Sequence, residues 1–310
     1  MCGLLAMSFK KGVISPGRRA ILANNLARLN DKRGGDSWGM AVIDEESNQV
    51  NVTRGLGNAA DHAHVLADAN MFLGHTRLAT TGAKTIENAH PFEIGNIIGA
   101  HNGIIYNRLE LDRKYSRDCA VDSMHFFHHL DAGLSFEDIE GYGAIQWIRK
   151  DDPTKIFLSK LKNGSLSIYG IGKKEDHQAE GVVVSSDDKH VLEALYCAGI
   201  KKFFPYKVEE GTIYFINDGD VYIATNEKLK LKEGYTTGKH LADWDGGSYT
   251  GHAQHFSRGY GGYTGEKTQS LLQLTEGGNQ SGNESEKDLA DWREWTKFCE
   301  QHKDEVMSEQ

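Results

Sequence analysis

The sequence contains no long hydrophobic run. No stretch of its 310 residues approaches the roughly 20 consecutive apolar residues that a membrane-spanning helix requires. The first residues are also too few and too polar to form a secretory signal peptide. We therefore expect a cytoplasmic protein without a membrane partner.

Basic segments are scarce as well. The chain has 35 Lys and Arg residues against 44 Asp and Glu residues, which gives a formal net charge of -9 at pH 7. Binding to a nucleic-acid backbone depends on clustered positive charge, so we expect no nucleic-acid partner. An acidic balance of this size mainly favours solubility.

Closely spaced cysteines are absent. Cys2, Cys119, Cys197 and Cys299 lie far apart in the sequence, so the spacing predicts neither a disulfide framework nor a zinc ribbon. A reducing compartment suits a free thiol at Cys2.

Metal and nucleotide motifs are incomplete. His125, His128 and His129 fall near helical spacing, which can present two imidazoles to a metal, but no carboxylate or cysteine spacing completes a site. The segment 170–174 lacks the spacing of a phosphate-binding loop. We therefore expect no metal and no cofactor.

Short apolar runs bounded by Gly, Asn or Asp predict many strands. The last two runs form a hairpin, because Asn217 to Asp220 contains an Asp-Gly pair that adopts positive φ in tight turns. The predicted strands cover residues 3–9, 40–43, 50–53, 71–74, 96–101, 144–148, 156–159, 165–169, 182–185, 212–216 and 221–224.

Helical spacing is clearest where Ala20, Leu22, Leu26 and Leu29 follow the Ser15-Pro16 start signal. Further helices are predicted at 106–115, 122–130 and 189–198. Strands with helices before and between them indicate a layered α/β or α+β domain. With 39% hydrophobic residues, such a domain can bury a sizeable core.

The composition changes near residue 230. Residues 231–284 are rich in Gly, Ser and Tyr, which predicts a flexible linker or arm. Residues 285–310 predict an acidic amphipathic helix with Leu289, Trp292 and Trp295 on one face. Such a helix either packs on its own domain or binds a partner or second subunit.

Residue 2 carries the main chemical signal. Removal of Met1 makes Cys2 the amino terminus, so one residue can supply both a nucleophilic thiol and a base. The base is the α-amine, whose reference pKa is about 8. Cys2 is therefore a candidate catalyst.

Further polar residues follow two predicted strands. Arg77 can pair with a carboxylate through its planar guanidinium, and Thr80 adds a hydroxyl donor. Asn102 offers a side-chain N–H and Gly103 a backbone N–H, the two parts of an oxyanion hole. Taken singly, Arg77 also fits a solvated surface arginine, and Asn102-Gly103 also fits an ordinary Asn-Gly turn.

In this order, the residues resemble the class II glutamine amidotransferases, whose glutaminase domain has an N-terminal nucleophile. The resemblance covers roughly residues 2–225 and implies an α+β fold, a four-layer αββα sandwich of the N-terminal nucleophile hydrolase type. We assign that domain to residues 2–230. The matching segments are Cys2 to Leu5, Arg33 to Gly39, Gly74 to Thr80, Asn88 to Pro91, and His101 to Gly103 followed by Asn107.

The resemblance also implies a role for each matched residue of the reaction centre. Cys2 would form a γ-glutamyl thioester, with its own α-amine as the general base. Asn102 and Gly103 would hold the oxyanion, and Arg33 would support the terminus.

The same resemblance implies how glutamine is bound. Arg77 with Thr80 would bind the α-carboxylate, and Asp122 would pair with the α-ammonium group. Leu78 and Thr81 stand where several relatives have Trp and His, so we expect the loop over the substrate to differ here.

The implied reaction converts L-glutamine and water to glutamate and ammonia. No acceptor domain follows residue 230, so we expect ammonia to pass to a synthetase or amidating enzyme on a separate chain. A homo-oligomer is compatible with this interpretation. Two alternatives remain: a hydrolase of γ-glutamyl amides or other N-acyl amides, and a non-catalytic interaction protein that retains the scaffold.

Overall fold

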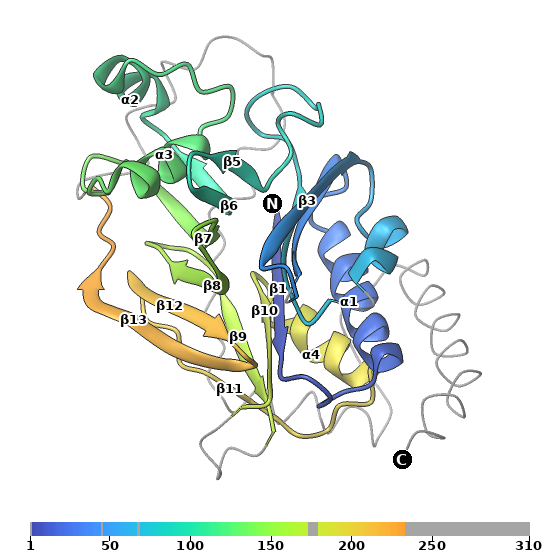
Figure 1. The fold of residues 1–310 in the computed structure, drawn as a ribbon. Helices are drawn as coiled ribbons and strands as arrows, with labels where there is room; N and C mark the ends of the chain where they lie inside the picture. The colour runs from blue at the N-terminus through green and yellow to red at the C-terminus, as the bar shows by residue number, and fades with distance from the viewer. Residues whose placement is uncertain (1, 45, 67–68, 173–178, 233–310) are drawn as a thin grey trace, which may run out of the picture. The chain divides into compact units, whose positions relative to one another are not determined.

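The computed structural model describes residues 2–44, 46–66, 69–172 and 179–232 (Figure 1). Apart from residues 231 and 232, the predicted arm 231–284 and the predicted helix 285–310 lie outside these residues. Their boundaries and roles stay predictions.

Two antiparallel sheets form the centre of the described domain. The first has the strand order β11-β9-β10-β1-β4-β2-β3, and the second the order β13-β12-β8-β7-β6-β5. The first sheet contains β1 (Gly3–Phe9), β2 (Ser37–Asp44), β3 (Gln49–Leu56), β4 (Met71–Arg77), β9 (Ser167–Ile171), β10 (Gly181–Ser185) and β11 (Phe203–Pro205). The second contains β5 (Phe92–Ile94), β6 (Ile97–Ile105), β7 (Gly141–Arg149), β8 (Asp152–Lys160), β12 (Thr212–Asn217) and β13 (Asp220–Lys228).

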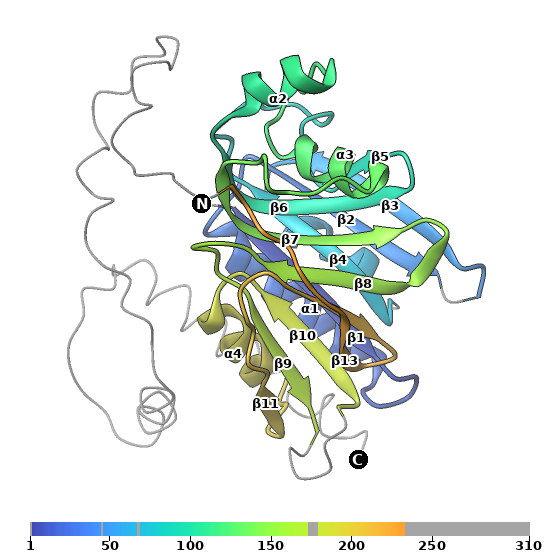
Figure 2. The same cartoon turned by 90° about the vertical axis from the view of Figure 1, so that its left-hand side faces the viewer.

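Helices cover the outer faces of the two sheets (Figures 1 and 2). The first sheet is covered by α1 (Pro16–Asp31) and α4 (Asp188–Cys197), and α1 also contacts the 3-10 helix η1 (Ala60–Leu66). Next to β5 and β6 of the second sheet lies α3 (Met124–Ala132), which follows α2 (Arg108–Tyr115). The predicted four-layer αββα sandwich is confirmed.

Buried apolar residues of the described part form three clusters that correspond to the three spaces between the layers. Strand β1 contributes to two of them. Leu5 and Met7 pack in the cluster that includes α1 and α4, whereas Leu4 and Ala6 pack in the cluster between the sheets. Because successive side chains of a strand point to opposite faces, β1 is apolar at nearly every position and buried throughout.

Most predicted elements are confirmed. Helix α1 begins where Ser15 Oγ accepts a hydrogen bond from the Arg18 N–H. The β12–β13 hairpin turns through Asp218 and Gly219 with φ values of 44° and 71°, the positive pair that a two-residue turn of this kind requires. The sequence did not predict β5, β11 or η1, since β5 and β11 have three residues each, too few for a clear alternation.

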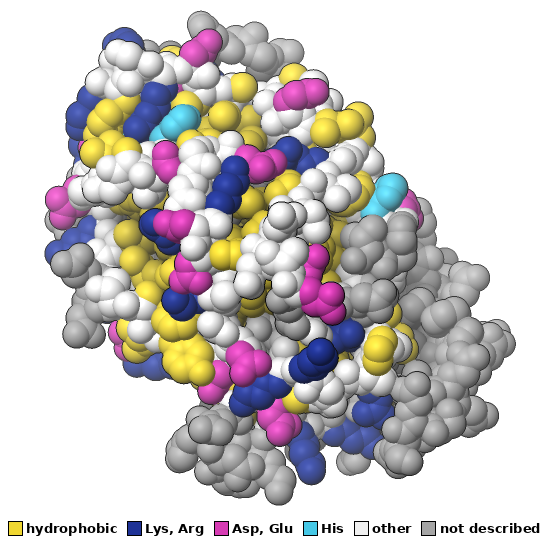
Figure 3. Space-filling model, viewed as in Figure 1, with side chains coloured by type: hydrophobic (Ala, Val, Ile, Leu, Met, Phe, Trp, Pro, Cys, Tyr) yellow, Lys and Arg dark blue, Asp and Glu magenta, His cyan; other side chains and the backbone are white. Residues whose placement is uncertain are grey.

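Within the described ranges, no helix is both long and apolar enough to cross a membrane. Lys, Arg, Asp and Glu side chains of both signs are interspersed on the face of the molecule shown in Figure 3. The cytoplasmic location stays a prediction.

One buried amide links the two sheets. Gln146 of β7 is fully buried, and its Nε2 donates to Gly74 O at 2.7 Å and Leu5 O at 3.3 Å. Both acceptors belong to the opposite sheet, so this side chain connects the layer that carries Cys2 with the layer that carries Asn102 and Gly103.

Replacing Gln146→Met keeps the approximate size of the side chain but removes both hydrogen bonds. We expect the free energy of unfolding to fall by about 1–3 kcal/mol, because two buried carbonyls lose a donor. Urea denaturation followed by circular dichroism measures this change, with Asn51→Met on the exposed face of β3 as the control. Equal midpoints for the two variants would show that the link contributes nothing.

Candidate active site

The start of β1 is held by side chains from distant segments. Arg33 Nε donates to Cys2 O at 3.1 Å, and Arg33 Nη1 lies 2.7 Å from Asp187 Oδ2 in an ion pair. The Leu4 N–H donates to Ser186 Oγ at 3.0 Å, and the Ser186 N–H donates to Leu4 O at 3.0 Å. Cys2 therefore begins a strand whose first residues are fixed on both sides.

Gly3, next to Cys2, has no room for a side chain. A Cβ atom there would lie 2.4 Å from Asn30 Oδ1 and 2.7 Å from Thr76 Oγ1. These two neighbours are themselves fixed, because Thr76 Oγ1 donates to Asn30 O at 2.8 Å. Glycine at position 3 is thus required by packing, independently of any chemistry at Cys2.

The Cys2 thiol faces the loop after β4. Its Sγ lies 3.4 Å from the Leu78 N–H, which donates to it. Burial raises the pKa of the Cys2 thiol, and the Leu78 N–H and the charge of Arg77 partly offset that rise. The Asp122 carboxylate also raises this pKa, so Cys2, Arg77 and Asp122 lie within electrostatic range of one another.

Arg77 is buried at the end of β4, with 2% of its surface exposed. Its Nη1 donates to Ala83 O at 3.0 Å and its Nη2 to Thr81 O at 2.5 Å. Burial lowers the pKa of Arg77, although a guanidinium stays protonated in proteins. The same side chain therefore organises the loop and places a positive charge beside Cys2.

Asp36 also shapes this loop. Its Oδ2 accepts from the Ala79 N–H at 2.9 Å, and its Oδ1 lies 2.7 Å from Lys84 Nζ. The Lys84 hydrogen bond lowers the pKa of Asp36. The sequence pattern includes Asp36 in a matching segment but predicts no role for it. Thr80 is exposed in the loop, unlike the other six residues predicted for the site.

Asp122 is buried just before α3. Its Oδ2 accepts from the Ile105 N–H at 2.7 Å, at the end of β6. Burial raises the pKa of Asp122, and backbone hydrogen bonds from Ile105 and Ser123 oppose that rise. A buried carboxylate is thus held at the end of the strand that carries the predicted oxyanion hole.

Asn102 and Gly103 lie on β6 opposite Ala144 and Gly143 of β7. A Cβ atom on Gly103 would come within 2.0 Å of Tyr142 O, so strand packing alone requires glycine at this position. The start of β1 contacts β6 (Figures 1 and 2), which brings the two sheets' candidate residues to one region.

His101 of β6 connects its strand to the turn before α3. Its place in the sequence pattern did not predict this role. Its Nε2 lies 3.1 Å from Tyr142 O and its Nδ1 lies 2.8 Å from Ser123 Oγ. Ser123 follows Asp122 directly. His101 therefore ties the residue before Asn102 to the turn that positions Asp122.

Comparisons with known proteins support the resemblance seen in the sequence. No family model matches the chain. It is 30% identical to the glutamine–fructose-6-phosphate aminotransferase (isomerizing) of Vibrio parahaemolyticus over 274 residues, covering 80% of this chain and 41% of that protein. Over 206 residues it is 31% identical to the protein of the same name from Pyrococcus horikoshii, covering 59% of this chain and 33% of that protein.

The fold has a counterpart among solved structures. The allosteric regulatory enzyme of purine biosynthesis superposes with a TM-score of 0.50 and 18% identity, covering 74% of this chain and 50% of that chain. At this identity the likeness concerns the fold. The chain spans 41% of the length of the Vibrio relative. Together, the comparisons confirm the resemblance to the class II glutamine amidotransferase domain.

Gly34 tests how tightly the loop after Arg77 is held. A Cβ atom at Gly34 would lie 2.6 Å from Arg77 C and 2.7 Å from Leu78 N. We expect Gly34→Ala to destabilise the fold by about 1–3 kcal/mol, because backbone atoms must move. Gly17→Ala is the control, since nothing lies within 4 Å of its Cβ position and alanine favours helix. Equal melting temperatures for both variants would contradict the packing argument.

Three buried histidines lie beneath the candidate site. The rings of His75 and His90 have centroids 4.1 Å apart, and neither nitrogen of His90 has a hydrogen-bond partner among the described residues. Burial lowers the pKa of His75 to about 3 and that of His101 to about 4, and it lowers the pKa of His90 as well. The folded protein thus keeps these rings neutral in mild acid.

This burial predicts acid sensitivity with a defined sign. Between about pH 6.5 and pH 4 the unfolded chain binds protons on these rings that the folded chain does not, so stability falls as the pH falls through this range. His90→Phe removes one such group, and we expect a shallower decline in urea midpoints from about pH 7 to about pH 5. His62→Gln, at an exposed position, is the control. A slope unchanged by His90→Phe would contradict the assignment.

Proposed function

We propose that the protein hydrolyses L-glutamine to glutamate and ammonia through a thioester on Cys2. One observation carries the proposal. The Cys2 thiol at the start of β1 lies against the Leu78 N–H and within electrostatic range of both Arg77 and Asp122. A nucleophile within electrostatic range of a buried cation and a buried anion suits the amide of an α-amino acid, whose far end carries both charges.

Recognition of glutamine follows from the two buried charges. The α-carboxylate pairs with Arg77 and the α-ammonium group with Asp122. Arg77 has five N–H donors, of which it uses two on loop carbonyls, so donors remain for a carboxylate. Thr80 is exposed on the same loop and contacts the carboxylate when the loop covers the substrate.

The first half-reaction forms the thioester. The mechanism requires that Met1 be removed, so that the α-amine of Cys2 is free. This amine takes the thiol proton as Sγ attacks the amide carbon. The carbonyl oxygen becomes an oxyanion, stabilised by the Asn102 side chain and the Gly103 N–H. The amine then protonates the leaving nitrogen, and the C–N bond breaks to release ammonia.

The second half-reaction reverses these roles. Water attacks the thioester carbon while the α-amine takes its proton, and the same two donors stabilise the second oxyanion. The C–S bond breaks, the sulfur takes the proton back, and glutamate leaves. Asn102, Gly103 and the α-amine thus act in both halves, whereas Arg33 acts only by holding the Cys2 backbone.

We further propose that ammonia passes to an acceptor enzyme on a separate chain. The name of the Vibrio relative joins glutamine to a second substrate, fructose 6-phosphate. That name supports transfer of the nitrogen rather than simple release. It does not identify the acceptor of this chain.

A hydrolase of γ-glutamyl amides or other N-acyl amides is the second candidate. It shares Cys2 and the oxyanion donors. A γ-glutamyl amide carries the same α-ammonium group as glutamine, so Asp122, buried and held by the Ile105 N–H, argues only against N-acyl amides that lack this group.

Glutamate release from L-glutamine tests the nucleophile. Intact mass first confirms that the purified protein lacks Met1. We expect Cys2→Ala to lower turnover by about 10³-fold or more, because the covalent route is lost, while its melting curve stays close to that of the wild type. Covalent labelling by a glutamine analogue with an electrophilic side chain reports the same thiol. Turnover that survives in Cys2→Ala would rule the thioester out.

Asp122→Asn tests the binding of the α-ammonium group. Loss of a charged hydrogen bond lowers kcat/KM for glutamine by about 10–100-fold. The matched control is glutaric acid monoamide, which has the same amide and carboxylate but no α-amine. For this substrate we expect the wild type and Asp122→Asn to perform equally. A similar loss on both substrates would mean that Asp122 acts only through the fold.

A further inference from the structure

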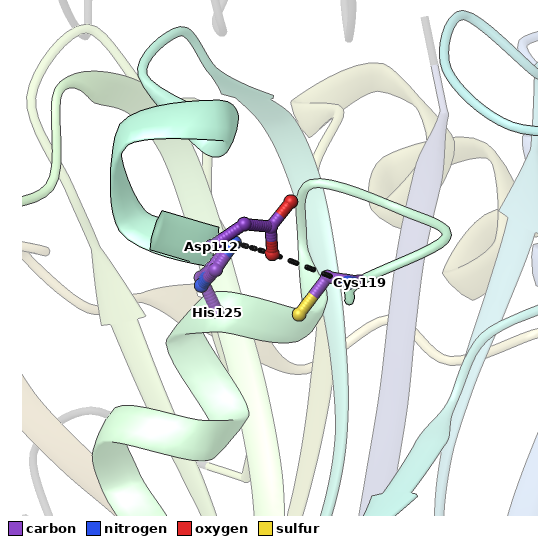
Figure 4. Close-up of side chains that lie close together, drawn as sticks. All are labelled: Asp112, Cys119 and His125. Atoms are coloured by element: carbon purple, nitrogen blue, oxygen red, sulfur yellow. Dashed lines mark hydrogen bonds and ion pairs between the residues drawn. The ribbon is translucent and has the colours of Figure 1, made fainter. Parts of the chain in front are cut away.

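A cluster of three potential metal ligands lies between α2 and α3, outside the residues used above. Asp112 lies on α2, Cys119 on the connection that follows, and His125 on α3 (Figure 4). Their ligand atoms all lie within 4.8 Å of one another. Cys119 is 2% exposed and His125 is fully buried.

The hydrogen bonds of the cluster leave one nitrogen unused. Asp112 Oδ1 accepts from the Cys119 N–H at 3.2 Å, and it lies 3.1 Å from His125 Nε2. The geometry of this second approach does not make a hydrogen bond, and His125 Nε2 has no hydrogen-bond partner among the described residues. A fully buried ring nitrogen thus lies 3.1 Å from a carboxylate oxygen without a hydrogen bond to it.

We propose that Asp112, Cys119 and His125 form a binding site for a zinc ion. Zinc accepts mixed sulfur, nitrogen and oxygen ligands at about 2.0–2.3 Å, which puts tetrahedral ligand atoms about 3.3–3.6 Å apart. The separation of 3.1 Å between Asp112 Oδ1 and His125 Nε2 is already short enough, and the other separations, at up to 4.8 Å, need to contract by about 1 Å. A thiolate and an imidazole beside one carboxylate suit zinc better than magnesium or calcium, which prefer oxygen ligands.

Two of the proposed ligands can carry the negative charge that a zinc ion needs. Binding displaces the thiol proton of Cys119 to solvent, so a thiolate and a carboxylate together neutralise Zn²⁺. Arg117, whose Nη1 lies 3.5 Å from His125 Nδ1, and Arg108, which donates to Cys119 O at 2.8 Å, oppose the ion. Burial lowers the pKa of His125 to about 4, which keeps its ring neutral, and raises the pKa of the Cys119 thiol to about 12, so the ion has to displace a tightly held proton. The Asp112 side chain is 15% exposed, which gives a fourth ligand, water, access to the ion.

The position of the cluster suggests what the ion would hold in place. Cys119 and His125 flank Asp122 in the sequence at equal distances, three residues on either side. An ion bound to both residues and to Asp112 fixes the turn that presents Asp122 and attaches it to α2. Only this consequence rests on the proposed function.

Metal content after reconstitution tests the site. The Cys2→Ala protein is used as the host, so that the other candidate thiol cannot bind zinc. The host is stripped with a chelator, given Zn²⁺, desalted and analysed by inductively coupled plasma mass spectrometry. We expect about one equivalent per chain in the host and a loss of at least about 10-fold in affinity in Cys119→Ser and Asp112→Asn.

Matched variants and a spectroscopic probe distinguish loss of the metal site from loss of the fold. His128→Gln, on the same helix, and Cys197→Ala, on α4, should retain zinc. Co²⁺ in place of zinc should give a thiolate-to-cobalt charge-transfer band in the host that disappears in Cys119→Ser.

Equal zinc retention by the host and Cys119→Ser, or cobalt bound without that band, would overturn the proposal. These readouts need no turnover, so they are independent of the outcome for glutamine hydrolysis.

Discussion

The guanidinium of Arg33 holds the backbone at Cys2 in place. It reaches from the end of α1 to Cys2 O, to Ser186 O and to the Asp187 carboxylate. These contacts join the segment after α1, the residue before β1 and the segment after β10. A chain terminus normally frays because few contacts hold it. Here Arg33 and the adjoining strand β1 hold the backbone of residue 2 in place, which a terminal nucleophile requires.

Burial of opposite charges is the second constraint. Arg77 and Asp122 are both nearly inaccessible, and neither forms an ion pair with the other among the described contacts. Instead, Arg77 donates to loop carbonyls and Asp122 accepts a backbone N–H. Burying charges in this way is costly unless hydrogen bonds compensate. A ligand that carries both an anion and a cation would relieve that cost, and a free α-amino acid is such a ligand.

Sequence patterns predicted the elements that the core determines. Strand β1 and helix α1 were predicted nearly residue by residue, because their apolar periodicity and the Ser15 cap are local signals. Short segments without such periodicity, β5, β11 and η1, were missed. The order of strands in the two sheets was not predicted, since pairing such as β1 with β10 joins segments far apart in the chain. The resemblance implied only the four-layer arrangement.

The sequence likewise predicted only part of the candidate site. The motif residues Cys2, Arg77 and Asp122 were named from the sequence, and the structure places them within electrostatic range of one another. The roles of Asp36 in the loop and of His101 beside Ser123 depend on contacts across 43 and 22 residues. Such contacts leave no spacing signal. The grouping of Cys119 with Asp112 and His125 was not predicted, because helical spacing relates His125 only to His128 and His129 as possible metal ligands.

The loop after β4 connects these observations. Arg77 donates to Thr81 O and Ala83 O, so the cation assigned to the substrate carboxylate also holds the loop in its present form. A carboxylate that takes over either donor releases a loop carbonyl and loosens the loop, whereas one that uses the remaining donors leaves it ordered. Leu78 and Thr81 lie in this segment, and Leu78 is 41% exposed. Under the proposed assignment, loop order and affinity for the substrate are coupled through Arg77, and we expect substitutions at Leu78 and Thr81 to change both together.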